Sequence, residues 1–332
     1  MSVPTLVDVA RVAGVSRSTV SRVVNDDPSV SEETRARVRT AIDSLRYRPN
    51  LSARSLVSRQ PAALGVLVGG VTGFGPQCDL NMIQSAARAA GRRVFTQVAD
   101  DLSEHAISHA LDALLELRVD AIISLVPQAA LVDQSQLKDL GVPLVGVEVD
   151  ADVLPLTVGV DNELGARLAT THLLDLGHAV VVHLAGPKGW NESESRIRGW
   201  RTALDARGLE APSVFRASAW TAEAGYRAGQ EIAGLGGVTA VFCANDHLAL
   251  GLLSALRDRD LLVPGDVSVV GFDDVAEAAH FTPPLTTVRQ DFHELARRAV
   301  ATAEVALSGG AMESGMVAPR LVARRSTAPA RG

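Results

Sequence analysis

The sequence predicts a small all-α head followed by a large α/β body. Two short stretches with helical apolar spacing, joined by a glycine, lie within residues 5–25. Beyond residue 63, runs rich in Val, Ile and Leu alternate with helical stretches, which is typical of doubly wound parallel sheets. The 332 residues are too many for one ordinary domain and suit two or three.

Charge divides the chain in the same way as the predicted elements. Residues 1–60 hold ten arginines, no lysine and six acidic residues, a net charge of +4, whereas the rest of the chain carries −10. A basic head on an acidic body is expected when only the head meets phosphate groups. An arginine-rich face that contacts only solvent would give the same balance.

The composition indicates a cytoplasmic protein without a membrane partner. Hydrophobic residues make up 47% and charged residues 21%, and no uncharged apolar run reaches the roughly 18 residues of a membrane span. Asp8 and Arg11 interrupt the stretch where an export signal would be apolar. Two distant cysteines, Cys78 and Cys243, indicate no disulfide framework.

The head has the pattern of a helix-turn-helix. Val9, Ala10 and Ala13 share one face of a helix that Thr5 can cap and that Gly14 ends. A second helix is predicted over 16–25 and a third over about 31–46. Two short helices joined by a glycine-containing turn form a DNA-reading motif, although a generic three-helix bundle has the same periodicity.

The predicted second helix turns three valines inward and a polar face outward. Its first turn would meet base edges in the major groove, where a guanidinium can pair with guanine. Arg17 is therefore the first candidate for base reading, followed by Ser18 and Arg22. Short polar residues at helix starts or on the groove side suit phosphate contacts; these candidates are Thr5, Ser16, Ser21, Asn25, Ser31 and Thr34.

Polar residues follow the predicted strands of the body. Ligands of doubly wound folds bind at the carboxyl ends of the strands, so Ser124, Glu148, Asn245 and Asp273 are candidate contacts. Several hydrogen-bonding groups with few aromatics suit a polyhydroxylated small molecule. Acidic residues after strands can instead cap the next helix. We expect that role for Asp246 and Asp274, and we leave Asp161 and Asn162 out of the site on the same ground.

Signatures of other chemistry are missing from the sequence. The glycines at 70, 73 and 75 match neither a dinucleotide fingerprint nor a P-loop, and no G-x-S-x-G elbow is present. Histidines and cysteines show no metal-ligand spacing, so no cofactor is expected. The alternative to a DNA-binding protein is a soluble sugar-binding protein or a carbohydrate-active enzyme without a DNA function.

The head also resembles a known family. TLVDVARVAGVSRSTVSRVVN followed by VSEETRARVRTAIDSLRYRPNLSARSL, covering residues 5–56 without a gap, is similar to the N-terminal region of the lactose/galactose-repressor (LacI) family of transcriptional regulators. This resemblance implies a hinge helix after Pro49 that orders on operator DNA. Asn50 can cap this helix, Ala53 would pack on the minor-groove floor, and Leu56 would wedge between base pairs.

The resemblance continues through the body, where VDNELGARLATTHLLDLGH, HLAGP, SRIRGWRTAL, VFCANDHLALG, VPGDVSVVGFDD and FTPPLTTVRQDF follow in family order. It implies a two-lobed sensor domain similar to periplasmic sugar-binding proteins. By position, Arg196 resembles the family's ligand-gripping arginine, Trp220 its sugar-stacking indole, and Asn245, Asp273 and Gln290 further polar contacts. Departures occur at Glu148, where lactose-type members have a shorter acid, and at Ser124, which replaces a larger amide. A sugar is therefore better supported than a galactoside.

The expected organisation has three parts. Residues 1–49 form the DNA-binding domain, 50–60 the hinge and linker, and 61–332 the sensor. Lobe 1 is expected over about 61–160 and 291–320, and lobe 2 over about 161–290 and 321–332. The C-terminal segment has no apolar heptads, so we expect a homodimer rather than a larger assembly. The expected function is repression from a near-palindromic operator, relieved by a small sugar.

Overall fold

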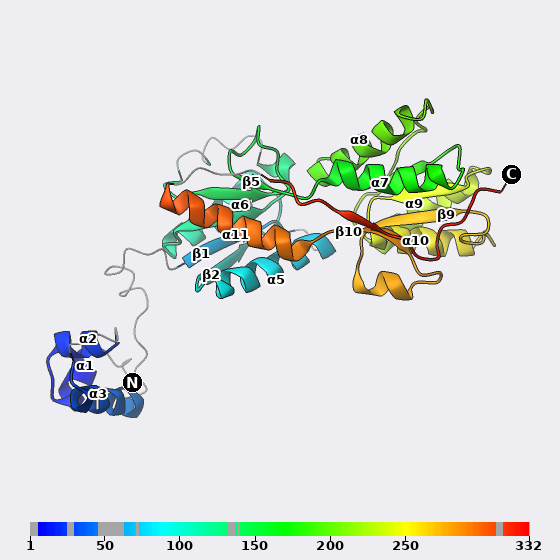
Figure 1. Ribbon diagram of the computed structural model, residues 1–332. Helices are drawn as coiled ribbons and strands as arrows, with labels where there is room; N and C mark the ends of the chain where they lie inside the picture. The colour runs from blue at the N-terminus through cyan, green and yellow to red at the C-terminus, as the bar shows by residue number, and fades with distance from the viewer. Residues whose placement is uncertain are drawn as a thin grey trace. The chain divides into compact units, whose positions relative to one another are not determined.

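The computed structural model describes residues 6–24, 30–45, 63–70, 73–131, 137, 140–309 and 315–331. The chain forms two compact units, Met1–Pro61 and Ala62–Gly332 (Figure 1). Each unit is considered by itself below. Within the described ranges, no helix has both the length and the apolar character that a membrane span requires.

The first unit contains three helices around a small apolar core. They are α1 (Leu6–Ala13), α2 (Arg17–Val24) and α3 (Glu32–Leu45). Val9, Val20 and Val38 are fully buried, one from each helix. Gly14 ends α1 with a φ of +63°, as predicted, and Arg37 of α3 donates to the Ala13 carbonyl at 2.7 Å. The turn between α1 and α2 is thus fixed by glycine and by a cap from the third helix.

The first sheet of the second unit is wholly parallel, with strand order β2-β1-β3-β4-β5. Its strands are β1 (Ala63–Val68), β2 (Arg93–Val98), β3 (Ala121–Leu125), β4 (Leu144–Val147) and β5 (Thr157–Val158). Its helices are α5 (Phe74–Ala89), α6 (Glu104–Glu116) and α11 (Phe292–Ser308), with a 3-10 turn η1 (Gln128–Ala130).

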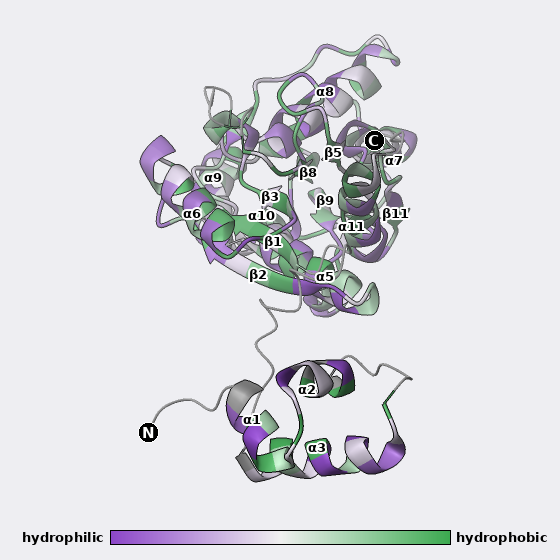
Figure 2. Cartoon of the chain, turned by 90° about the vertical axis from the view of Figure 1, so that its left-hand side faces the viewer, coloured by the Kyte–Doolittle hydropathy of each residue, from purple (hydrophilic) through white to green (hydrophobic). Residues whose placement is uncertain are grey.

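Side chains that alternate along β1 supply two cores. Leu64 and Val66 pack under α5 and α11, whereas Leu67 packs under α6 with Leu114. This alternation is what a strand covered by helices on both faces requires. In Figure 2, β1 and β3 are accordingly hydrophobic, while the helices carry hydrophilic outer faces.

The second sheet has the order β11-β10-β9-β8-β6-β7, and only the β10–β11 pair is antiparallel. Its strands are β6 (Val182–Ala185), β7 (Phe215–Arg216), β8 (Ala240–Cys243), β9 (Ser268–Asp273), β10 (Thr286–Arg289) and β11 (Arg320–Val322). Its helices are α7 (Asn162–Asp175), α8 (Asn191–Asp205), α9 (Ala222–Gly234) and α10 (Asp246–Arg257), with a 3-10 turn η3 (Ala276–His280).

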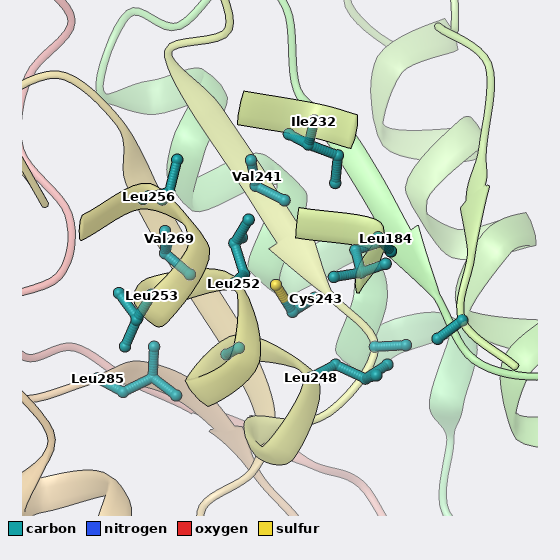
Figure 3. Close-up of a cluster of buried hydrophobic side chains, with 14 of the residues drawn as sticks. Leu184, Ile232, Val241, Cys243, Leu248, Leu252, Leu253, Leu256, Val269 and Leu285 are labelled. Carbon is teal, nitrogen blue, oxygen red and sulfur yellow. The ribbon is translucent and has the colours of Figure 1, made fainter. Parts of the chain in front are cut away.

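Each face of this sheet is again covered by a helix pair. α9 and α10 close one core around Val241, Cys243 and Leu252 (Figure 3). α7 and α8 close the other around Trp200 and Phe242. The predicted α/β class is confirmed, and the second unit consists of two lobes that are each a three-layer sandwich.

The chain passes between the two lobes at three places, after β5, after β10 and before β11 (Figure 1). Two of these crossings lie side by side, because Val160 bridges Val317 and the Asp161 amide donates to the Val317 carbonyl at 2.9 Å. As a result α11 packs on the first sheet although it follows β10 of the second.

Candidate functional site

The outward face of α2 carries the predicted base-reading side chains. Arg17, Ser18 and Arg22 are exposed, while Val20 and Val23 of the same helix are buried. This arrangement leaves a polar, basic strip on a helix whose other face is anchored in the core. Such a strip has the shape and charge that suit a major groove.

Two of the predicted phosphate contacts have a local structural role. Ser16 caps α2, because its Oγ accepts the Thr19 amide at 3.1 Å. Ser31 caps α3 by accepting the Thr34 amide at 3.4 Å, and its hydroxyl donates to the Thr34 Oγ1 at 2.9 Å. Both serines precede their helices by one residue, and both are exposed.

Several predicted DNA contacts cannot be located. Thr5, Asn25, Asn50, Ala53 and Leu56 lie outside the described residues, and the description does not extend to the Ser21 side chain. Their roles stay predictions.

In the second unit, six of the seven predicted ligand contacts meet in one cleft. The cavity volume of this cleft is about 50 Å³, which is smaller than the usual small-molecule site. The cleft is lined by Gly73, Phe74, Gly75, Pro76, Asp79, Glu148, Trp190, Glu192, Arg196, Trp220, Asn245, Asp273, Gln290 and Phe292.

Ser124 is the predicted contact that the structure does not bring to this cleft. It lies within β3, it is fully buried, and its Oγ accepts the Val126 amide at 3.3 Å. The Ser124 hydroxyl therefore serves as the hydrogen-bond acceptor for a backbone amide at the end of its own strand. A longer side chain at this position would be needed to reach past the strand end.

A chain of hydrogen bonds joins the two lobes at the cleft. Glu148, which follows β4 in the first lobe, accepts the Val160 amide and the Asn162 Nδ2, both at 2.7 Å. The Oδ1 of Asn162 in turn accepts the Arg196 Nε of α8 in the second lobe at 2.8 Å. Asn162, excluded from the predicted site as a helix-start residue, thus links a carboxylate of one lobe to the guanidinium of the other.

Arg196 is buried and held from several sides. Its Nη1 donates to the Ala244 carbonyl at 2.5 Å and lies 4.0 Å from the Asp273 Oδ1. The guanidinium stacks over the Phe272 ring at 3.8 Å. Gln290 donates to the same Asp273 oxygen at 2.6 Å. Burial raises the pKa of Asp273 to about 6, even though Arg196 and the Gln290 hydrogen bond act in the opposite direction.

Trp220 forms one wall of the cleft, and Gly186 makes room for it. A β-carbon on Gly186 would lie 2.1 Å from the indole, so no other residue fits behind the ring as it stands. The Trp220 carbonyl accepts the Asn245 Nδ2 at 3.4 Å. Asn245 also caps α10 by accepting the Leu248 amide at 2.8 Å. Asn245 therefore holds both the Trp220 wall of the cleft and the start of α10.

The prediction that Asp246 and Asp274 cap helices is wrong. Asp246 is the first residue of α10 rather than its cap, and it accepts the Thr287 hydroxyl at 2.5 Å and the Val275 amide at 2.9 Å. Asp274 forms ion pairs with Arg289 and Arg324 instead. Asp246 thus links α10 to β10, and Asp274 links the end of β9 to Arg289 of β10 and to Arg324.

The backbone at the strand ends is held in a strained conformation. Glu148, Asp273 and Asp274 have φ values of +58°, +111° and +58°, a region that residues with a β-carbon rarely occupy. Strain of this kind clusters at ligand sites. It turns the first two of these side chains into the cleft, because both line it.

Six side chains of the cleft were not predicted from the sequence. They are Phe74, Pro76, Asp79, Trp190, Glu192 and Phe292. All lie on helices or directly before one, whereas the residues predicted from the pattern alone follow strands. Only the packing of one lobe against the other brings these helix starts to the strand ends.

The side chains of the cleft can bind a small polar molecule, and the described residues form no metal centre. Both donors and acceptors face the cleft, and four aromatic side chains contribute apolar walls. Across the described part of the chain, no three His, Cys, Asp or Glu residues are grouped to hold a metal ion. Mixed hydrogen-bonding groups beside flat rings suit the hydroxyls and C–H faces of a sugar.

Comparisons with known proteins agree with this geometry. Residues 5–50 match the model for bacterial regulatory proteins of the lacI family, and residues 170–327 match a periplasmic binding protein-like domain. The lactose operon repressor of Escherichia coli K12 is 33% identical over 97% of this chain and 90% of its own length. The transcriptional regulator GalR of the same strain is 34% identical over 92% of this chain and 88% of its own.

Among solved structures, the lac repressor dimer bound to operator and the anti-inducer ONPF superimposes with a TM-score of 0.91 and 31% identity. The match covers 98% of this chain and 100% of that one. The relatives are transcriptional regulators rather than enzymes. Because the similarity extends through both the helix-turn-helix and the two-lobed domain, this chain belongs to the lacI family of bacterial regulatory proteins.

Proposed function

We propose that this protein is a transcriptional repressor that binds a near-palindromic operator as a homodimer and releases it when a small sugar fills the cleft. Residues 1–49 read the DNA, 50–60 form the hinge and 61–332 sense the sugar. The observation that carries the proposal is the hydrogen-bonded chain Glu148–Asn162–Arg196, which runs from one lobe to the other beside the cleft and supports a ligand site shared by both lobes.

In the head, Arg17 reads a base at the start of α2, with Ser18 and Arg22 beside it on the exposed face. Ser16, Ser31 and Thr34 at the helix starts are proposed phosphate contacts. Their backbone amides and hydroxyls lie at helix N-termini, where an anion is favoured. For the hinge, Ala53 and Leu56 are proposed minor-groove contacts on the strength of the family resemblance.

In the sensor, a sugar would accept hydrogen bonds from Arg196 and Asn245 and donate to Glu148 and Asp273. Trp220 would stack on its apolar face. Because these groups come from both lobes, the ligand favours one angle between them. A ligand that binds one lobe arrangement better than another shifts the population toward it. By linkage, the operator must weaken sugar binding by the same factor as the sugar weakens operator binding.

The alternative of a sugar-binding protein without a DNA function leaves the helix-turn-helix unexplained. Fluorescence anisotropy decides between the two. The full-length protein is titrated onto DNA fragments enriched from a random pool, and mono- and disaccharides are then added. Release by at least one sugar supports the proposal. Sequence-specific DNA binding that no sugar alters would contradict the sensor role, and absence of specific DNA binding would contradict the repressor role.

A further inference from the structure

The cleft is more acidic than a site for a neutral sugar requires. Among the described residues, its lining holds the four carboxylates of Asp79, Glu148, Glu192 and Asp273 and one cation, Arg196. Arg196 is already engaged with Asp273 and, through Asn162, with Glu148. Asp79 and Glu192 therefore remain without a hydrogen bond or ion pair to a cation among the described residues, although burial raises the pKa of Glu192 and the charge of Arg196 acts to lower it.

One of these two carboxylates is buried without a partner. Asp79 lies on α5 in the first lobe, its exposure is 7%, and its Oδ1 has no hydrogen-bond partner among the described residues. A buried acceptor that is left unsatisfied is destabilising, and a charged one more so. Native proteins tolerate such a group where a ligand supplies the missing donor.

The second carboxylate comes from the opposite lobe. Glu192 lies in the first turn of α8, and it is the charge that acts most strongly on Asp79. Burial, followed by the repulsion from Glu192, raises the pKa of Asp79 well above its usual value. The two acids thus come from opposite lobes, line the same cleft, and form no ion pair with any described residue.

The space beside them has the chemistry of a cation site. Asp79, Glu148 and Glu192 also line a small recess of the cleft, together with Pro76 and Trp190. Trp190 meets Trp220 edge to face, with ring centroids 6.0 Å apart. An ammonium group has three donors for carboxylate acceptors, and it is attracted to indole faces.

From this geometry we propose that the effector is a sugar bearing a protonated amine, with the ammonium placed between Asp79 and Glu192. The inference rests on the proposed sugar-sensing function and specifies the ligand of that same site. A primary amine fits better than a divalent cation, because in the described chain no three acids, those of the recess included, are grouped so that they could hold a metal ion.

The test compares each amino sugar with its own neutral form. Glucosamine and galactosamine, and their N-acetyl derivatives, are titrated by calorimetry into the full-length protein. The amine should bind roughly 10- to 100-fold more tightly than the N-acetyl form, as expected for a charge-assisted hydrogen bond. Glu192→Gln and Asp79→Asn should each remove most of that preference. Glu194→Gln is the matched control, because Glu194 pairs with Arg216 outside the cleft.

The outcomes separate this inference from the proposed function. Operator release by neutral sugars but not by amino sugars would overturn the inference that the effector carries an amine, and the proposed repressor function would still stand. Release by neither set, with no sugar bound, would overturn the proposed function itself. Binding of spermidine alone, or of Ca²⁺ or Mg²⁺ alone with the same sensitivity to Asp79→Asn, would also overturn the inference. If one of the variants does not fold, the other still decides.

Discussion

Replacing Arg196 by lysine should separate ligand binding from the architecture of the cleft. A guanidinium has five N–H donors, and two are used within the protein, by Asn162 and by the Ala244 carbonyl. Three donors are left for a ligand. A lysine ammonium has three donors in all, so after serving the same two acceptors it offers the ligand one. The positive charge opposite Asp273 is kept.

The loss can be estimated from this donor count. Two charged hydrogen bonds to a sugar, at about 1.5 kcal/mol or more each, amount to about 3 kcal/mol. Affinity for the releasing sugar should therefore fall by about two orders of magnitude. The ligand-free protein should bind its operator as before, because the contacts that lysine gives up lie in the cleft.

Both quantities can be measured on one preparation. Sugar affinity follows from the intrinsic fluorescence of the cleft tryptophans, and operator affinity from anisotropy. Arg198→Lys is the control, since Arg198 lies on the same helix but is exposed and pairs with Glu163. An affinity for sugar within about threefold of wild type would refute the donor count. Equal loss of operator binding without sugar would show that Arg196 is a structural residue.

Three further perturbations test other parts of the molecule. Gly186→Ala should push the Trp220 ring back by more than about 1 Å, because the new β-carbon would lie 2.1 Å from it. Sugar affinity should then fall at least roughly tenfold. An unchanged sugar titration curve and an unchanged tryptophan emission maximum would contradict this. Arg17→Ala should relax preference at one operator position by roughly 1–3 kcal/mol, whereas a uniform loss over all operator variants would make it a phosphate contact. Asp79→Asn should stabilise the ligand-free protein against urea, and more at pH 7 than at pH 4. Burial and Glu192 raise the pKa of Asp79, so the stability it contributes is present below the ordinary aspartate value of 3.8 and is lost as pH rises through the raised value. An equal stability difference between Asp79→Asn and wild type at both pH values would refute this direction of the pKa shift.

The sheets could be predicted because their strands are continuous apolar runs. β1 and β9 are buried along their whole length, so composition alone separates them from the helices between. β7, β10 and β11 were not predicted, because they span only two, four and three residues and each contains an arginine. β11 becomes a strand only through antiparallel pairing with β10, which no local pattern encodes.

The strand-end part of the cleft could be predicted, but the helix-borne part could not. Glu148 and Asn245 follow strands and Asp273 ends one, and the carboxyl ends of these strands in both sheets line the cleft. Asp79 lies in the second turn of α5 and Glu192 in the first turn of α8, and an acid near a helix start usually contacts only solvent or the helix dipole. Whether such an acid faces solvent or a cleft depends on how the two lobes meet, and that depends on crossings far apart in the sequence.

The positive φ angles at Glu148 and Asp273 limit how this cleft can diversify. A change at either position alters a side chain and also a backbone conformation that few residues accept. Asp79 and Glu192 carry no such restriction, because both sit in regular helix where most residues are tolerated. Relatives that respond to different ligands can therefore arise most readily through these two helix positions, while the strand-end acids persist as a common scaffold for hydroxyl groups.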